Sequence, residues 1–242
     1  MTGAALEFRD VSYRIAGNSI LDQLSFRLEH GRTLVLLGRS GSGKTTALKM
    51  LNGLLFPSSG GVFVEDRATT DWNLIELRRS IGYVIQDVGL FPHFTIGENV
   101  ALVPRLQGWP AGRIAARVAE LLHQVGLEPG RFRDRYPRQL SGGQRQRVGV
   151  ARALAAQPKL LLFDEPFGAL DPVTRAELQD QFLELRDRLQ KTSIFVTHDV
   201  REALRLGTEI ALLHRGRLEE LTTPAQFLNA EGEEARAFLS TL

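Results

Sequence analysis

The fold is decided by one short stretch, Gly38-Arg39-Ser40-Gly41-Ser42-Gly43-Lys44-Thr45. It fits the pattern G-x-x-x-x-G-K-[ST], in which glycines let the backbone turn tightly and aim successive N–H groups at phosphates. The 242-residue chain has four lysines, and one of them occupies the position that this pattern reserves for lysine. A Gly/Ser-rich turn would match by chance with odds on the order of one in a few hundred. The stretch therefore predicts a nucleotide-binding phosphate loop.

The residues on either side predict the strand and the helix that a phosphate loop requires. The apolar run Leu34-Val35-Leu36-Leu37 is typical of a buried strand, and residues 45–51 are typical of a helix. The positive end of that helix would face the phosphates. We expect Lys44 to reach the β- and γ-phosphates and the hydroxyl of Thr45 to bind Mg²⁺, with Thr46 completing the nucleotide contacts.

Strand-like and helix-like segments alternate along the rest of the chain. Short alternating segments between residues 6 and 37 predict strands, and further strands are expected at 81–85, 160–163 and 192–196. From about residue 89 the pattern becomes helical; Pro110 opens a stretch with Ile114, Val118 and Leu121 on one face. We expect one α/β domain over residues 1–242, with a helical subdomain inserted at about 89–157.

The composition indicates a soluble globular protein: 43% of residues are hydrophobic and 24% are charged. Thirty basic residues against 28 acidic ones give a net charge of +2, too small to indicate a nucleic-acid partner. The absence of cysteine excludes disulfides, a thiol nucleophile and a cysteine-ligated metal. No signal-peptide pattern and no apolar run of about 20 residues occurs, so we expect a cytoplasmic chain that reaches a membrane through a partner.

A second glycine-rich motif, called the signature motif below, consists of Leu140-Ser141-Gly142-Gly143-Gln144. Alone it predicts a serine-capped helix start, which can also bind an anion. Together with the phosphate loop it resembles the ATP-binding subunits of ABC transporters, and the resemblance runs from about residue 6 to residue 227. A phosphate loop alone also occurs in kinases, GTPases and helicases, whereas the signature motif is found almost only in this superfamily. The resemblance implies a P-loop NTPase core with an antiparallel β subdomain and an inserted helical subdomain, and it implies ATP and Mg²⁺ as cofactors.

The resemblance also implies roles for five residues that follow strands or begin a helix. Asp164 ends an apolar strand and is similar to the family's holder of Mg²⁺, and Glu165 to the residue that polarises the attacking water. Gln86 resembles the glutamine that touches metal and water and reports to the membrane partner. His198 resembles the switch histidine that binds the γ-phosphate. Asp171 lies in a loop, residues 168–171, that crosses to the partner subunit, and it is also expected to cap the next helix.

In this family the signature motif closes over the nucleotide that the other subunit holds. The resemblance therefore implies a dimer of this chain, or a dimer with a closely related ATPase subunit. Each ATP would contact Lys44 of one subunit and Ser141 and Gly143 of the other. Related subunits stack an aromatic side chain on adenine near the position of Ile15, so here either Tyr13 or aliphatic surface would take that place. Tight preference for ATP over GTP is not expected.

The sequences of residues 82–93 and 101–109 resemble those of the ATP-binding subunits of importers for osmoprotectants and quaternary amines, such as glycine betaine and choline. A separate membrane permease and, indirectly, a solute-binding protein are the implied partners, with the chain on the inner face of the membrane. Leu90, Phe91 and Phe94 are candidates for permease contact or for subdomain core. Only 44 residues follow His198, so we expect no regulatory domain after the cassette. The alternatives are an importer of a sugar, amino acid or ion, or a non-transport ABC ATPase.

Overall fold

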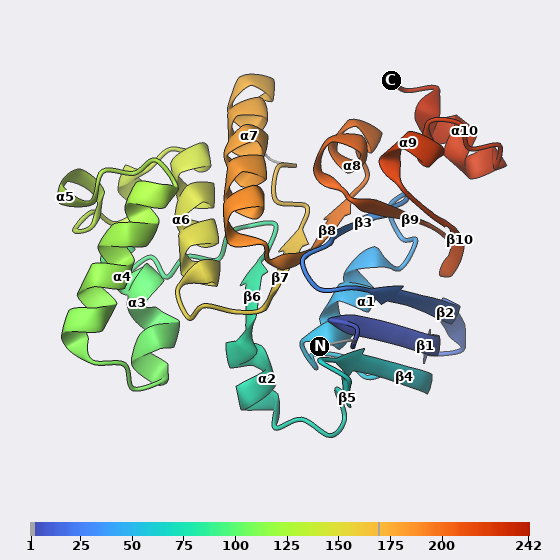
Figure 1. Ribbon diagram of the computed structural model, residues 1–242, viewed down its shortest axis with the longest axis horizontal. Coiled ribbons are helices and arrows are strands. Elements are labelled where there is room, and N and C mark those ends of the chain that lie inside the picture. The colour runs from blue at the N-terminus through green and yellow to red at the C-terminus, as the bar shows by residue number, and fades with distance from the viewer. Residues whose placement is uncertain (1–2, 169) are drawn as a thin grey trace. The chain divides into compact units, whose positions relative to one another are not determined.

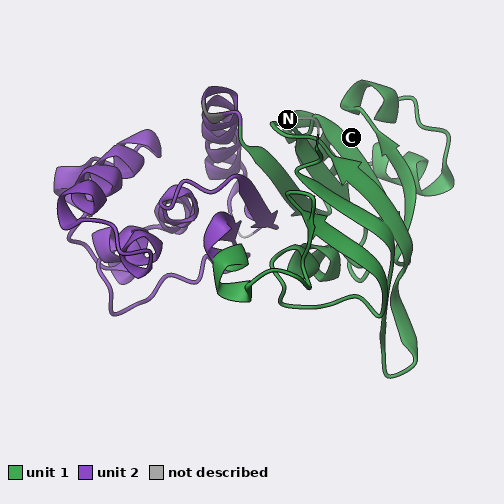
Figure 2. Cartoon of the chain, turned by 60° about the horizontal axis from the view of Figure 1, so that its bottom comes forward, with its two compact units in different colours: residues 1–78, 191–242 green, residues 79–190 purple. Residues whose placement is uncertain are grey.

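The computed structural model describes residues 3–168 and 170–242, apart from the side chain of Leu189, and it divides the chain into two compact units. Unit 1 comprises Met1–Arg78 and Lys191–Leu242, and unit 2 comprises Arg79–Gln190 (Figure 2). The boundary falls inside a short helix, α2, which spans Leu74–Ser80. Ala169, in the loop expected to cross to a partner subunit, lies outside the described residues.

Unit 1 contains an antiparallel sheet in the order β2-β1-β4-β5. Its strands are β1 Leu6–Ile15, β2 Asn18–Leu28, β4 Ser59–Val64 and β5 Arg67–Ala68. β1 is the central strand, with Leu6 opposite Leu28 of β2 on one side and Val64 of β4 on the other. Figure 1 shows β1, β2 and β4 side by side. β1 and β2 lie where the alternating N-terminal pattern predicted strands, whereas β4 and β5 lie beyond that pattern.

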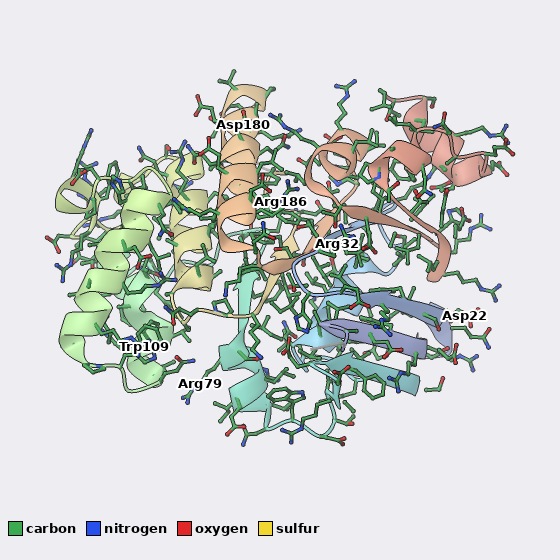
Figure 3. The ribbon with its side chains drawn as sticks, in the orientation of Figure 1. Asp22, Arg32, Arg79, Trp109, Asp180 and Arg186 are labelled. Carbon is green, nitrogen blue, oxygen red and sulfur yellow. The ribbon has the colours of Figure 1, made fainter. Side chains whose placement is uncertain are left out.

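Unit 1 also contains parallel pairing around β3, which spans Thr33–Leu37. β3 pairs in parallel with β8 (Thr192–Thr197) and with β9 (Glu209–His214), and β9 forms a hairpin with β10 (Arg217–Thr222). Arg217 of this hairpin donates from Nε to Asp22 of β2 at 2.8 Å, and Figure 3 labels Asp22. The helices of unit 1 besides α2 are α1 Lys44–Leu51, α8 Val200–Leu206, α9 Pro224–Phe227 and α10 Glu233–Leu239.

Unit 2 combines a pair of parallel strands with helices. The strands are β6 (Ile81–Val84) and β7 (Leu160–Asp164), and Val84 lies opposite Phe163. The helices are α3 Ile96–Leu106, α4 Ala111–Gln124, α5 Pro129–Phe132, α6 Gly142–Leu154 and α7 Pro172–Leu189, with a 3-10 turn at Pro137–Gln139. α3, α4 and α6 pack against one another (Figure 1). The predicted α/β fold is confirmed.

The amphipathic pattern after Pro110 forms α4 as expected. Pro110 is its N-cap residue, and Ile114, Val118 and Leu121 are buried. Trp109 lies in the connection from α3, and the Arg113 guanidinium stacks on its ring 3.5 Å from the centroid (Figure 3). In the described parts of the chain, none of the helices combines the length and the apolar character that a membrane crossing requires.

Candidate nucleotide site

In unit 1 the phosphate loop runs from the end of β3 to the start of α1. All of β3 is buried, which fixes the point where the loop begins. Gly43 closes the loop with a φ of 100°, and a side chain there would place its Cβ 2.5 Å from Cδ2 of Leu21. Glycine alone tolerates both the backbone conformation and the close approach. Glycine as the N-cap of α1 therefore lets the end of the phosphate loop pack directly against Leu21.

Lys44 is buried inside this loop, with 5% of its surface exposed. Its Nζ donates to the carbonyl oxygens of Gly38 at 2.6 Å and Arg39 at 2.8 Å, and it lies 3.5 Å from Oγ of Ser42. An ammonium group needs such partners because burying it without them is costly. The loop residues Ser40 and Gly41 are exposed, and Ser42 is buried. The positive charge of Lys44 is thus held within the turn that the sequence pattern assigns to phosphates.

His198 emerges at the same sheet edge as the phosphate loop. β3 and β8 are neighbouring parallel strands, and Leu37 lies opposite Thr197. The residues that follow, Gly38 and His198, therefore leave adjacent strands at their carboxyl ends, where open α/β sheets place ligands. His198 is exposed. Unit 1 thus brings two of the predicted site segments together.

A buried hydrogen bond beneath His198 was not predicted. Thr197 Oγ1 donates to Glu202 Oε2 at 2.6 Å, and it accepts from the backbone N–H of Asp199 at 3.0 Å. Glu202 is 5% exposed although it is ionisable. Asp199 in turn caps α8 by accepting from the N–H of Arg201 at 2.8 Å. These contacts fix the turn that carries His198. The sequence shows only an acid four residues after a histidine, with no sign that this acid is buried.

Tyr13 lies on β1 directly opposite Leu21, the residue that approaches Gly43. It is half-buried, whereas Ile15 further along the same strand is 52% exposed. The structure therefore brings the strand of Tyr13 close to the end of the phosphate loop. Whether Tyr13 or aliphatic surface contacts adenine stays a prediction.

In unit 2 the predicted acidic residues stand at the end of β7. Asp164 is the last residue of the strand, and Glu165 follows with a φ of 45°. A non-glycine residue in this left-handed conformation is strained by about 1–3 kcal/mol, and such strain concentrates at functional sites. Gln86 is exposed two residues beyond the end of β6, the parallel neighbour of β7. The three side chains therefore follow the carboxyl ends of paired strands.

Tyr83, which was not among the predicted site residues, contacts Asp164. Its Oη lies 3.4 Å from Asp164 Oδ2. Burial, together with the charge of Asp164 and the hydrogen bond to it, raises the pKa of Tyr83, so the phenol stays protonated and remains a donor. Its place on β6, three residues before Gln86, was the available signal.

The loop after Gln86 is held by two further residues that the sequence did not single out. Arg152 of α6 donates to the carbonyl oxygens of Gly89 at 2.6 Å and Val88 at 2.5 Å, and burial lowers its pKa. Asn99 of α3 is fully buried and bonds the backbone N–H of Phe91 through Oδ1 at 2.8 Å. Phe91 remains 41% exposed. The loop is therefore anchored from both sides while it presents an aromatic side chain outward.

The signature motif forms the start of α6. Ser141 and Gln144 form a capping box: Ser141 Oγ accepts from the N–H of Gln144 at 3.3 Å, and Gln144 Oε1 accepts from the N–H of Ser141 at 3.0 Å. Ser141 and Gly142 are exposed, and Gly143 is buried. A Cβ on Gly143 would lie 2.5 Å from Cγ2 of Thr174, so glycine allows α6 to approach α7.

Asp171 caps α7 beside this motif, as expected. Its carboxylate accepts from the N–H groups of Thr174 at 3.0 Å and Val173 at 3.2 Å, and these bonds hold the pKa of Asp171 below its usual range. Unit 2 therefore brings Asp171 and the signature motif together. The phosphate loop, Thr46, Tyr13 and His198 belong to unit 1, and the remaining predicted residues belong to unit 2. Among residues 3–168 and 170–242, no group of three or more His, Asp or Glu side chains could hold a metal ion.

Comparison with known proteins identifies chains of similar sequence. The osmoprotectant import ATP-binding protein OsmV of Salmonella typhimurium is 48% identical over 88% of this chain. The choline transport ATP-binding protein OpuBA of Bacillus subtilis is 47% identical over 90%, and the glycine betaine uptake system ATP-binding protein YehX of Escherichia coli is 46% identical over 92%. The matches span 56%, 57% and 72% of those proteins, so this chain covers little more than half the length of the first two.

Solved structures agree with the fold. CbiO1 of Clostridium perfringens, part of an ABC transporter complex, has a TM-score of 0.86 at 28% identity and covers 94% of this chain and 92% of its own. The ATP-binding cassette MJ0796, dimeric and bound to ADP and Pi, has a TM-score of 0.80 at 33% identity and covers 90% of this chain and 98% of its own. The family model described as ABC transporter matches residues 21–168, which is more than half of the sequence. The chain therefore belongs to the ABC transporter family.

Proposed function

We propose that this chain is the ATP-hydrolysing subunit of an ABC importer and that it energises uptake of an osmoprotectant such as glycine betaine or choline through a separate permease. The observation that carries the ATPase part is the phosphate loop, with a buried lysine folded into a glycine-bounded turn at the start of α1. The solute class is supported by the relatives at 46–48% identity, whose names specify osmoprotectant, choline and glycine betaine transport.

In this proposal residues 38–46 bind the phosphates of ATP, with Lys44 supplying the positive charge. Glu165 polarises the water that attacks the γ-phosphate, and His198 contacts that phosphate. The left-handed backbone of Glu165 and the bonded turn below His198 support these roles, because both side chains are held by strained or hydrogen-bonded backbone.

The same proposal assigns Mg²⁺ to Thr45, Gln86 and Asp164. A hydroxyl, an amide and a carboxylate are hard oxygen donors, the kind that Mg²⁺ takes in addition to phosphate oxygens and water. The bound ion would neutralise charge that develops on the transferred phosphoryl group. Tyr83 would orient the Asp164 carboxylate for this task through the hydrogen bond described above.

The partners proposed are a second copy of this chain, or a closely related ATPase subunit, and an integral membrane permease supplied by a solute-binding protein. Ser141, Gly142, Gly143 and Gln144, with Asp171, would complete the nucleotide site of the other ATPase subunit. The dimeric state of MJ0796 supports a paired cassette. The loop around the exposed Phe91 is the proposed permease contact, which would hold the chain at the inner face of the membrane.

The experiment is to copurify the chain with its membrane partner, reconstitute both in vesicles, and measure ATP hydrolysis with candidate solutes and their binding protein. Glycine betaine or choline should stimulate hydrolysis several-fold, and Lys44→Ala should abolish the stimulation. The matched control is Lys49→Ala, at the other end of α1, which should leave it unchanged.

Stimulation by a sugar, an amino acid or an ion, with none by betaine or choline, would overturn the solute class and leave an ABC importer. Copurification with ribosomes or DNA in place of a membrane protein would overturn transport itself.

A further inference from the structure

The side chain of Arg39 in the phosphate loop is tied to the last helix of unit 1. Its Nε donates to Glu234 Oε1 of α10 at 2.7 Å, across 195 residues of sequence. The arginine side chain is 66% exposed, whereas that of Glu234 is 9% exposed. A charged residue of the loop is therefore anchored on a carboxylate that is itself held in the interior.

Glu234 also lies close to a histidine. His214 Nδ1, at the end of β9, is 3.5 Å from Glu234 Oε2. The hydrogen bond from Arg39 is the main reason that the pKa of Glu234 lies below its usual range, and it outweighs burial, which acts in the opposite direction. The three side chains line one pocket of about 540 Å³ together with loop residues Ser40 and Gly41.

The ion pair between Arg39 and Glu234 would restrain the backbone of Arg39. Its carbonyl oxygen accepts from Lys44 Nζ at 2.8 Å and from the N–H of Ser42 at 3.2 Å. The β9–β10 turn holds the same loop on another side, because the N–H of Gly216 donates to the carbonyl of Ser42 at 3.2 Å. Fixing the Arg39 side chain therefore restrains the peptide that faces the lysine ammonium.

We propose that Glu234 is a positioning residue for ATP binding, which holds the phosphate loop in its binding conformation through Arg39. The inference rests on the proposed function, since it concerns how the same loop binds ATP. A loop that is already restrained loses less conformational freedom when the nucleotide binds, so the ion pair raises affinity without touching the phosphates. It acts on ATP affinity and KM and has little effect on kcat.

The test is a double-mutant cycle in the full chain, measured as the Kd of a fluorescent ATP analogue and as KM and kcat for hydrolysis. Glu234→Gln should raise Kd and KM by about three- to tenfold and leave kcat within about twofold. In an Arg39→Gln background the same substitution should change Kd by less than about twofold, because its partner is already absent. Glu233→Gln, an exposed neighbour in the same pocket, is the matched control and should change neither.

An unchanged Kd in Glu234→Gln, or an equal effect with and without Arg39, would overturn the inference. Should Glu234→Gln fail to fold, hydrogen exchange of wild-type protein and Arg39→Gln decides the matter. Because coupling is reciprocal, ATP should slow exchange of residues 233–239 in the wild type and not in Arg39→Gln. Equal slowing in both proteins overturns the inference.

The same measurements distinguish failure of this inference from failure of the proposed function. If wild-type protein binds no ATP, the proposed function fails as well. If it binds ATP and only the double-mutant cycle fails, the proposed function stands.

Discussion

The phosphate loop of unit 1 and the signature motif of unit 2 both place glycines at a helix start, but the two starts are completed differently. The N-cap of α1 is Gly43, which has no side chain, and the buried Lys44 follows it directly. The N-cap of α6 is Ser141, whose hydroxyl oxygen accepts from the N–H of Gln144 within a capping box. At the first start a buried lysine lies inside the turn, whereas at the second the capping box bonds the backbone N–H groups of Ser141 and Gln144 and leaves Ser141 and Gly142 exposed. We propose that the signature motif serves a site completed by another copy, and the predictions below test this.

Among substitutions in the two helix starts, loss of Lys44 should have the largest effect on ATP binding and hydrolysis. Lys44→Ala removes the one buried ammonium of the phosphate loop, and kcat/KM for ATP should fall on the order of 1000-fold. Nucleotide binding measured by equilibrium dialysis should fall with it. Lys49→Ala serves as the control within the same helix. Retained ATP binding in Lys44→Ala would mean that the phosphate loop does not hold the nucleotide.

Removal of the proposed water-polarising carboxylate should stop turnover without stopping binding. Glu165→Gln should lower kcat on the order of 100-fold, since general-base contributions are of that size. The uncleaved ATP should then hold two copies together, which size-exclusion chromatography would detect as a dimer. Glu184→Gln on the exposed face of α7 is the control. A Glu165→Gln protein that stays monomeric in saturating ATP contradicts the mechanism.

Gly143→Ala can distinguish a role of Gly143 in packing α6 against α7 from a role in contacting ATP. Gly143→Ala would force its Cβ to within 2.5 Å of Thr174 Cγ2, with a cost in unfolding free energy of about 1–3 kcal/mol. Turnover should fall about tenfold, while ATP binding by the separate chain is retained. Thr174→Ser deletes the clashing methyl and should restore the melting temperature of the double variant, but not its turnover. Recovery of turnover along with stability would show that Gly143 serves only helix packing.

The smallest effect is expected from the cap beside the signature motif. Hydrogen bonds from Thr174 and Val173 lower the pKa of Asp171, so its stabilising contribution is present above the ordinary carboxyl pKa and is lost as pH falls through the lowered value. Wild-type protein should melt at a higher temperature than Asp171→Asn near pH 7, and the difference should shrink toward about pH 3. A constant difference across that range would show that the charge of Asp171 contributes nothing.

The local parts of the fold could be predicted because local patterns specify them. The apolar run before the phosphate loop became β3, the run ending in Asp164 became β7, and the stripe after Pro110 became α4. Each rests on periodicity, on a cap or on a glycine-bounded turn within a few residues. The family resemblance, confirmed by the family match, then supplied the candidate roles of the site residues.

The residues that hold those side chains could not be predicted in the same way. Glu234 meets Arg39 across 195 residues, and Tyr83 meets Asp164 across 81. Asn99 is an ordinary polar residue of a helix in the sequence, and only its complete burial shows that it fixes the loop at Phe91. Such contacts depend on tertiary packing. The local pattern of a segment does not show which distant segment it will contact.

The most direct test of the central claim is to mix two inactive variants. Lys44→Ala has a defective phosphate loop and an intact signature motif. Ser141→Arg has an intact phosphate loop and a defective signature motif. If each site combines the loop of one copy with the motif of the other, half of the dimers in an equal mixture carry one intact site. The mixture should then hydrolyse ATP at roughly a quarter of the wild-type rate. A mixture no more active than the two variants measured separately would contradict the claim that the two motifs serve different sites.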